Sequence, residues 1–321
     1  MKVLKFGGTS VGSPERIKGV KKIIDSQTLP CVIVVSAFQG ITDELKHISE
    51  LAAARNNEYS VVLEKIILKH QEYINQLLSE DKQADVLKKT GKIFDGLLET
   101  LNGIWLLREL SKHSLDQVLS AGEILSSLII SNLFEDCQYT DSRSFIKTDS
   151  NFGFANVDFT LTNSIIQKIF HKTSKLIIVP GFIASNPKDE TTTLGRGGSD
   201  YTAAIIAAAL DADVLEIWTD VDGFMTADPK KVEKAYAIES LTYSEAIELS
   251  HFGAKVIYTP TLRPVYKKNI PILVLNSFKP ASKGTIISHK SVNGNQSPIK
   301  GISSIDHIDL ITLQGTGMVG V

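Results

Sequence analysis

Apolar and polar positions near the start of the chain predict two strands joined by a helix. The runs Lys2–Phe6 and Cys31–Val35 are short and rich in β-branched residues, and they flank a helical segment from Pro14 through Ser26. The second run reads CVIVV, a continuous apolar stretch typical of parallel strands that are buried on both faces. This β-α-β opening predicts a parallel sheet.

The middle of the chain is predicted to be almost wholly helical. From Thr42 to about Glu135, apolar residues such as Val86 and Phe94 recur at helical spacing. The stretch LDQVLSAGEILSSLIISNLF is nearly apolar on every side, so we expect a buried helix there.

Strand patterns return in the second half and alternate with helices. We expect strands at 176–179, 214–218 and 272–275, and helices at about 200–210, 243–252 and 261–268. Alternation of this kind predicts a doubly wound α/β fold, with helices on both faces of the sheet.

The last part of the chain reads as a separate unit. Residues 290–300, KSVNGNQSPIK, are polar and rich in turn formers, which predicts a linker. A strand is expected at 308–313, followed by a glycine turn. One strand without a partner cannot bury its apolar face, so we expect the chain to be the front part of a longer protein. The predicted organisation is a domain over 1–290, a linker over 291–300 and the beginning of another domain over 301–321.

Composition narrows the function classes. The apolar fraction of 43% and the charged fraction of 22% are ordinary for a globular protein. A net charge of -2 argues against broad binding to nucleic acid or to an anionic membrane. No signal peptide and no apolar run long enough for a membrane span is seen. Neither the two cysteines nor the seven histidines have the spacing of a metal site, and Cys31 is expected to be a buried, reduced thiol. We therefore expect a soluble cytoplasmic protein without a zinc site.

The first candidate site is the stretch KFGGTSVGS. Lys5 lies in the first predicted strand, and Gly7 and Gly8 follow its carboxyl end, the edge at which open α/β sheets bind ligands. Glycines let backbone N–H groups approach phosphate oxygens, and lysine supplies a mobile positive charge. A strand followed by two glycines is also an ordinary tight corner, so this stretch alone leaves both interpretations open.

The stretch GRGGSD favours anion binding more strongly. Arg196 offers a planar fork of donors that matches a carboxylate or a phosphate, and glycines surround it. Ser199 and Asp200 are expected to cap the following helix. Asp200 is either a plain N-cap or first-turn residue, or a partner for a substrate ammonium group or for Lys5.

Two further stretches carry candidates with both a structural and a functional interpretation. In WTDVDGFMTADPK, Thr219 and Asp220 end a predicted strand, so the segment is either an acidic turn or part of a nucleotide pocket with Lys230 on a phosphate. Lys255 in HFGAKVIYTP is either solvated surface or a further ligand contact. Thr42 is expected to cap the helix that follows SAFQG.

Glu123 stands in the predicted buried helix, where a carboxylate is costly unless it is paired. A ligand ammonium group is one candidate partner, and a hidden lysine or arginine is the other.

Together, the motifs KFGGTSV, TTLGRGGSDYTA, WTDVDGFMTADP and FGAKVIY resemble those of the aspartate kinases of the amino-acid kinase family, in the same order over roughly residues 1–290. The tail IKGISSIDHIDLITLQGTGMVG resembles the first strand and turn of the ACT-type regulatory region of this family. The sequence of this tail is most similar to that of the bifunctional aspartokinase–homoserine dehydrogenases, although no dehydrogenase sequence is present.

The resemblance implies a three-layer αβα sandwich with a mostly parallel open sheet, followed by a truncated ACT-type region. It implies transfer of a phosphoryl group from ATP, with Mg²⁺, to the side-chain carboxylate of L-aspartate. It also implies a homo-oligomer, most simply a dimer. Threonine or lysine would inhibit the whole protein, and we expect this chain to be insensitive to both because it lacks most of that region.

Matching positions imply roles for individual residues. Lys5 and Asp200 would be catalytic, and Arg196 would hold the substrate α-carboxylate while Glu123 faces the ammonium group. Met225 departs from the tyrosine expected in many relatives, which leaves a stacking contact to the nucleotide in doubt. Residues implied at the phosphates are Lys5, Gly7, Gly8 and Ser10. The substrate pocket would be completed by Thr42, Gly197, Gly198 and Ser199. The nucleotide would be lined by Thr219, Asp220, Met225, Lys230, Lys255 and Val256.

The residues agree with this chemistry. A side-chain carboxylate is already ionised at neutral pH, so it needs no general base, and no histidine stands in these motifs. What it needs is relief from repulsion by a polyanionic nucleotide. Acetylglutamate, glutamate, carbamate and UMP kinases remain as alternatives, together with a non-catalytic fragment that senses an amino acid.

Overall fold

The centre of the molecule is an eight-stranded sheet in a computed structural model that describes residues 1–28, 30–170, 176–251, 256–258, 262–290 and 299–304. All neighbouring strands are parallel except β9 and β10. In sheet order the strands are β3 (Cys137–Tyr139), β4 (Leu176–Pro180), β2 (Cys31–Val35), β1 (Lys2–Phe6), β7 (Val214–Thr219), β9 (Ile272–Asn276), β10 (Thr285–Ser288) and β8 (Ser240–Thr242).

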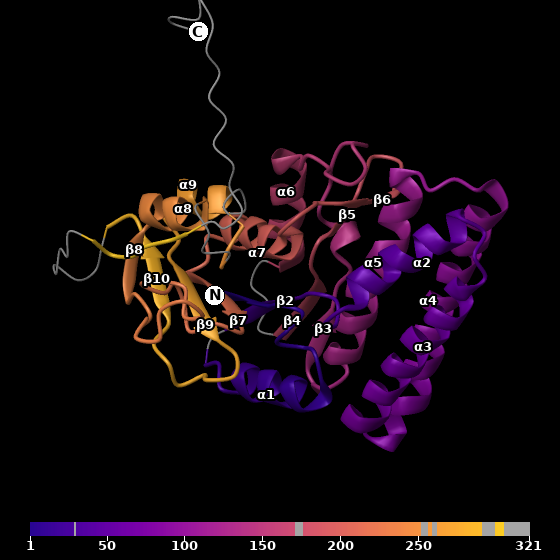
Figure 1. The fold of residues 1–321 in the computed structure, drawn as a ribbon, viewed down its shortest axis with the longest axis horizontal. Helices are drawn as coiled ribbons and strands as arrows, with labels where there is room; N and C mark the ends of the chain where they lie inside the picture. Colours follow the sequence, from indigo (N-terminus) through magenta and orange to yellow (C-terminus); the bar gives the residue numbers. More distant parts are fainter. Residues whose placement is uncertain (29, 171–175, 252–255, 259–261, 291–298, 305–321) are drawn as a thin grey trace, which may run out of the picture.

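Helices cover both faces of this sheet (Figure 1). On one face lie α1 (Pro14–Asp25) and α5 (Lys112–Ser131). Three more helices of that side pack on α5 and on one another, namely α2 (Ile41–Ala53), α3 (Glu58–Leu77) and α4 (Glu80–Leu107). The other face packs against α6 (Phe159–Phe170), α7 (Gly198–Ala209), α8 (Tyr243–His251) and α9 (Arg263–Lys268). The predicted three-layer αβα sandwich with a mostly parallel sheet is therefore confirmed.

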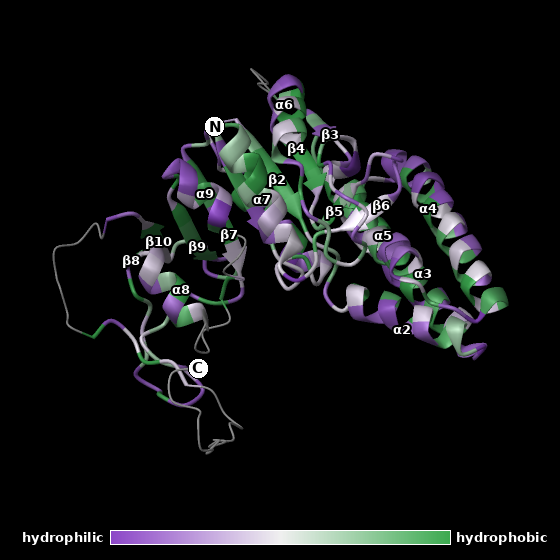
Figure 2. Cartoon of the chain, turned by 90° about the horizontal axis from the view of Figure 1, so that it is seen from above, coloured by the Kyte–Doolittle hydropathy of each residue, from purple (hydrophilic) through white to green (hydrophobic). Residues whose placement is uncertain are grey.

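Burial on both faces explains the apolar strand sequences. In β1, Leu4 and Phe6 belong to the core on the α1–α5 side, whereas Val3 belongs to the core on the α6–α9 side. Every residue of β2 is buried. Figure 2 shows the apolar strands β2 and β4 enclosed by helices that carry polar residues on their outer faces. Successive side chains of a strand point to opposite faces, so a doubly covered strand must be apolar throughout.

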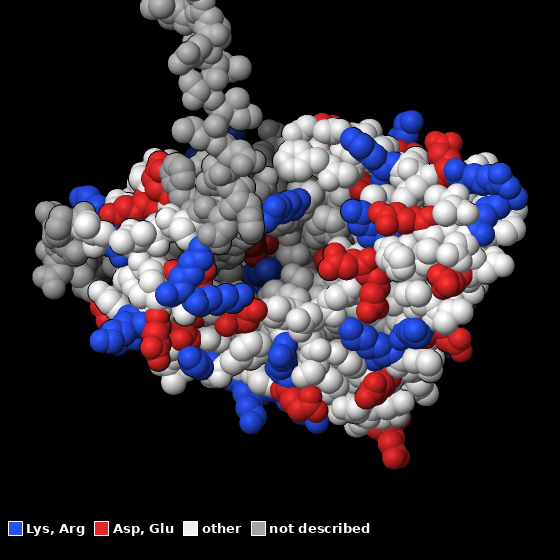
Figure 3. Space-filling view, viewed as in Figure 1, with Lys and Arg blue, Asp and Glu red and all other residues white. Residues whose placement is uncertain are grey.

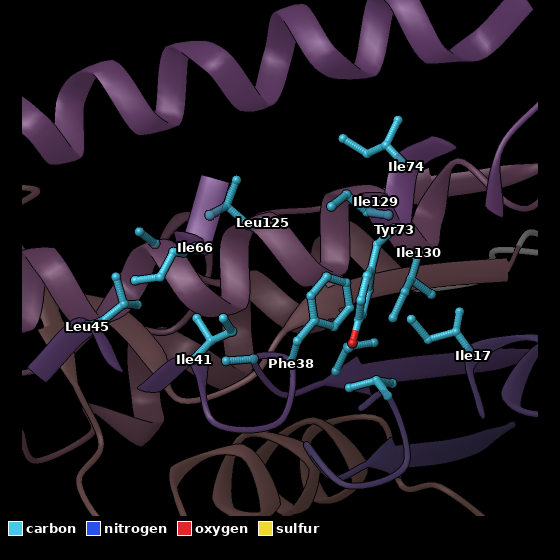
Figure 4. Close-up of a cluster of buried hydrophobic side chains, with 14 of the residues drawn as sticks. Ile17, Phe38, Ile41, Leu45, Ile66, Tyr73, Ile74, Leu125, Ile129 and Ile130 are labelled. Carbon is cyan, nitrogen blue, oxygen red and sulfur yellow. The ribbon is translucent and has the colours of Figure 1, made fainter. Parts of the chain in front are cut away.

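The core under α2 and α3 holds the loop that follows β2 (Figure 4). Phe38, three residues beyond β2, packs against two tilted rings, with 4.7 Å between its ring centroid and that of Tyr73 and 5.2 Å to that of the buried His70. Tyr73 in turn donates a 2.6 Å hydrogen bond to the Gly12 carbonyl. These contacts fix the loop at one end of the sheet, where the candidate site lies.

Several short elements were not predicted. They are α6, the hairpin of β5 (Ile183–Ser185) and β6 (Thr191–Thr193), strands β3, β8 and β10, and the 3-10 turn η1 (Ser142–Ser144). The expected strand at 308–313 lies outside the described residues. None of the helices in the described ranges combines the length and apolar character needed to cross a membrane.

Candidate functional site

A cavity of about 1110 Å³ opens at the carboxyl ends of β1, β2 and β7. Parallel strands end together at this edge, and loops from distant parts of the sequence meet above it. The candidates that line it are Lys5, Gly8, Thr42, Glu123, Arg196, Gly197, Gly198, Ser199, Asp200, Thr219 and Asp220. Residues that are far apart in the sequence are thus gathered into one space.

Lys5 and Asp200 form an ion pair inside this cavity. Lys5 Nζ lies 2.6 Å from Asp200 Oδ1, and the side chains are 12% and 13% exposed. Lys5 projects from β1 and Asp200 from the first turn of α7, so the pair joins the central strand to the helix behind it. Because both side chains are mostly buried, the ion pair holds the Lys5 ammonium group in one position at the cavity wall.

The start of α7 differs from the expectation. The N-cap residue is Gly197, whose φ of +69° suits glycine, so the prediction that Ser199 and Asp200 cap the helix is wrong. Asp200 instead lies in the first turn, which is the other structural position expected for it. Similarly, Gly40 precedes the first residue of α2, so the prediction that Thr42 caps that helix is wrong. Both helices nevertheless begin at residues that line the cavity or adjoin it, and the amino-terminal end of a helix favours bound anions.

Protein side chains fill part of the space around the glycine loop. A Cβ on Gly195 would collide with the ring of Phe154, and one on Gly197 would lie 2.5 Å from Tyr258 Cβ. Arg196, between them, is exposed and has no ion-pair partner among the described residues. The loop therefore presents one free guanidinium group to the cavity.

Glu123 is buried at the cavity wall. Its side chain comes from α5, and that helix lies close to the loop after β2 because Gly122 has no side chain to meet Ala37. Burial raises the pKa of Glu123 to about 8, and Oε2 has no hydrogen-bond partner. The described residues show no lysine or arginine paired with it. Glu123 is therefore mostly neutral at pH 7 in the free protein, and a cation bound beside it would favour its ionised form.

Asp116, one of the residues that the sequence did not single out, also lines the cavity. It is 1% exposed and accepts hydrogen bonds from two backbone N–H groups and one hydroxyl. Burial is the main cause of its raised pKa. The available signal was its place seven residues before Glu123, which puts both acids on one face of α5.

Gly7 and Ser10, which were expected at the phosphates, line neither cavity and lie beside the larger one. The Gly7 N–H donates to the Trp218 carbonyl at 3.2 Å, which ties the turn after β1 to β7. Ser10 is fully buried, and its Oγ lies 2.8 Å from Ser277 Oγ. Ser277 in turn donates to the Thr219 carbonyl, so these residues hold three strand ends together.

A smaller cavity of about 260 Å³ adjoins the first at Thr219 and Asp220. It brings together the remaining nucleotide candidates that are described, Met225, Lys230 and Val256. Lys255 lies outside the described residues. Residues 302–304 also line this cavity, and the Ile302 N–H donates to the Thr226 carbonyl at 2.8 Å.

Charges are mixed over the molecular surface. Figure 3 shows basic and acidic side chains interspersed on one face, without a broad field of either sign. Among the residues that the structure describes, no group of three or more histidine, cysteine or acidic side chains could hold a metal ion by itself. A cation at this site would need oxygen ligands from a bound molecule.

Comparison with known proteins places this geometry in a family. The family model described as the amino acid kinase family matches residues 1–276. The chain is 37% identical over 330 residues to the chloroplastic bifunctional aspartokinase/homoserine dehydrogenase 2 of Arabidopsis thaliana, covering 99% of this chain and 36% of that protein. It is 34% identical to the lysine-sensitive aspartokinase 3 of Escherichia coli, covering 91% and 65%.

Solved structures agree. The chain matches E. coli aspartokinase III in complex with aspartate and ADP with a TM-score of 0.84 and 32% identity, covering 91% of this chain and 65% of that one. Aspartate kinase of Clostridium acetobutylicum matches with a TM-score of 0.79 and 30% identity, covering 94% and 66%. The chain spans about a third of the length of the bifunctional relatives. Since the family model covers most of the sequence and the fold agrees, this chain belongs to the amino acid kinase family.

Proposed function

We propose that the chain transfers the γ-phosphoryl group of ATP to the side-chain carboxylate of L-aspartate, giving 4-phospho-L-aspartate and ADP. The observation that carries the proposal is the pair of adjoining cavities, with the Lys5–Asp200 ion pair in the larger one. The aspartokinase relatives support the same substrates. The product would be the first intermediate on the way to lysine, threonine and methionine.

The larger cavity suits a free acidic amino acid. Arg196 would form a bidentate pair with the α-carboxylate, and its exposed, unpaired guanidinium group is available for that contact. Glu123 and Asp200 would accept hydrogen bonds from the ammonium group. An acetylated amino acid has no ammonium group and would leave the Glu123 carboxyl group buried without a partner.

The smaller cavity would take the nucleotide. Thr219 and Asp220 line both cavities, so a nucleotide there would direct its phosphates toward Lys5. Met225 and Val256 offer apolar contacts, while Lys230 is exposed at the rim. We include Lys255 by its position in the sequence motif.

The chemistry requires positioning and charge neutralisation. A carboxylate oxygen of the substrate attacks the γ-phosphorus, a new P–O bond forms, and the bond to the β-phosphate oxygen breaks as ADP leaves. Lys5 would neutralise charge on the transferring group, and Asp200 would hold its ammonium in place. Asp200 and Asp220 fit a role as single ligands of Mg²⁺ bound mainly by phosphate, which would neutralise further charge.

An ADP-release assay with aspartate, glutamate and N-acetylglutamate tests the proposal. We expect turnover with aspartate, and we expect Lys5→Ala to lower kcat by about 100-fold or more, the scale of a lost oxyanion donor. Lys18→Ala, which removes an exposed lysine of α1, is the control and should keep full activity. Preference for another acid would overturn the substrate assignment, and aspartate binding without ADP release would indicate a sensor instead.

A further inference from the structure

Asp116 makes an unusual set of contacts for a carboxylate in a ligand cavity. Its Oδ2 accepts hydrogen bonds from the Gly153 N–H at 2.9 Å and from the Thr193 N–H at 3.0 Å. Its Oδ1 accepts from Thr193 Oγ1 at 2.7 Å. Both oxygens are therefore used by the protein, and no ion pair to Asp116 occurs among the described residues.

These contacts hold two segments that meet at the Arg196 loop. Thr193 is the last residue of β6, and Gly195 and Arg196 follow directly. Gly153 belongs to the loop 149–156, which is fastened to β6 because the Ala155 N–H donates to the Thr193 carbonyl at 2.9 Å. The next residue of that loop, Phe154, packs against Gly195. Asp116 thus joins α5 to both sides of the loop that carries Arg196.

The charge of Asp116 makes a direct contact to the substrate unfavourable. A negative group at the wall of the cavity would repel the two carboxylates of an acidic amino acid. Burying that group also costs free energy unless hydrogen bonds compensate for it. Its three hydrogen bonds give a geometric reason for its presence, because charge-assisted bonds to backbone N–H groups fix main-chain segments firmly.

We propose that Asp116 is a positioning residue that holds the Arg196 loop in its binding geometry without touching the substrate. The Glu123 carboxyl group lies on the same face of α5, seven residues further on. A single helix would therefore set the distance between the groups that receive the ammonium and the α-carboxylate. The identity of the substrate rests on the proposed function, but the positioning does not.

Two substitutions of Asp116 distinguish the effect of its hydrogen bonds from the effect of its negative charge. Asp116→Asn keeps the shape, since the amide oxygen can accept from both N–H groups and Nδ2 can donate to Thr193 Oγ1 in a reversed hydrogen bond. Asp116→Ala removes all three bonds. We expect the alanine variant to raise KM for aspartate about 10-fold or more, on the scale of lost charge-assisted bonds. Its kcat and its KM for ATP should change less than about 3-fold, and the asparagine variant should stay close to the wild type.

Hydrogen–deuterium exchange without ligand provides a readout that needs no activity. We expect faster exchange over 149–156 and 193–197 in Asp116→Ala and near-normal exchange in Asp116→Asn. Thr193→Val, which removes only the hydroxyl contact, should give a smaller effect in the same segments and serves if the alanine variant does not fold. Unchanged exchange in both Asp116→Ala and Thr193→Val would overturn the proposal. So would equal rises of KM in the alanine and asparagine variants. An inactive wild type with the expected exchange pattern would contradict the proposed function alone.

Discussion

At the scale of single residues, the cavity holds groups whose ionisation depends on burial. Glu123 is 4% exposed with one free oxygen, and its pKa lies at about 8. Its folded-state pKa is above its ordinary value, so the free protein loses stability as the pH rises from about 4.5 to 8. A bound ammonium group would remove that penalty by favouring the ionised form.

Aspartate binding should therefore release a proton from Glu123. At pH 7 the free carboxyl group is mostly protonated, and the ammonium of the ligand would ionise it, so we expect the release of close to one proton. Calorimetric titrations in two buffers of different ionisation enthalpy measure this number. Glu123→Gln should bind more weakly and release no proton, and an equal release in both proteins would remove Glu123 from the binding site.

His70 makes stability fall in acid. Burial lowers the pKa of this fully buried histidine to about 4, although its hydrogen bond to the Ile66 carbonyl opposes the shift. The unfolded chain takes up the proton near pH 6.5, so stability is lost as the pH falls from 6.5 toward 4. We expect this residue to remove about 2 kcal/mol of unfolding free energy between pH 7 and pH 5.

Urea unfolding at these two pH values measures the loss. His70→Gln should lose less stability between pH 7 and pH 5 than the wild type, whatever its absolute stability. His47→Gln, at an exposed position of α2, should behave like the wild type. Identical losses in all three proteins would show that His70 does not titrate as described.

The sequence identified the residues that stand at strand ends but not those that act through neighbours. Lys5 was found because it stands beside two glycines at the ligand edge of a predicted sheet, and Arg196 because its planar donors stand among three glycines before a predicted helix. Asp116 was missed because its partners, Gly153 and Thr193, are distant in the sequence. Phe154 was missed because its packing on Gly195 arises only in the folded chain.

At the scale of elements, the placement of α7 depends on close backbone approach. Gly181 follows β4, and a Cβ there would lie 2.6 Å from Ser199 Cβ and 2.8 Å from Ser199 Cα. The first turn of α7 can therefore sit directly over the end of β4. This position brings Asp200 within reach of Lys5.

Gly181→Ala should lower both stability and activity, because the added methyl group must push α7 away from the sheet. We expect a loss of about 1–3 kcal/mol in unfolding free energy, the usual cost of overpacking. Gly96→Ala is the matched control, since nothing lies within 4 Å of the new methyl group in this exposed part of α4. It should stabilise the protein by about 0.5–1 kcal/mol. Thermal unfolding of both variants tests the pair, and a harmless Gly181→Ala would contradict the close approach.

Long elements were predictable and short ones were not. The apolar strands β1, β2 and β7 and the helices α4 and α5 follow clear periodic patterns. Strands β3, β5, β6 and β8 have three residues each, too few to show alternation. Helix α6 buries Thr162, Ile166 and Phe170 and exposes Phe159 and Leu161. Because apolar residues lie on both sides of this helix, its sequence does not show which side is buried.

At the scale of the whole molecule, the alternation of strands and helices was enough to predict the layers. The cavity was less accessible, because its shape depends on which loops meet above the sheet. The order of the strands puts β1 in the middle, between a strand that follows it closely in sequence and one from much later in the chain. The sequence pattern around β1 does not indicate that β7 pairs with it.

The buried hydrogen bond between Ser10 and Ser277 joins residues 267 positions apart and closes the base of the site. A ribosome adds about 5–20 residues per second, so the second serine is made roughly 13 s to 1 min after the first. For most of that interval β1 lacks its neighbour β7, which is complete only at Thr219, and β9 is complete only at Asn276. One edge of β1 would therefore stay unpaired on newly made chains until β7 emerges, and slower elongation would lengthen that exposure.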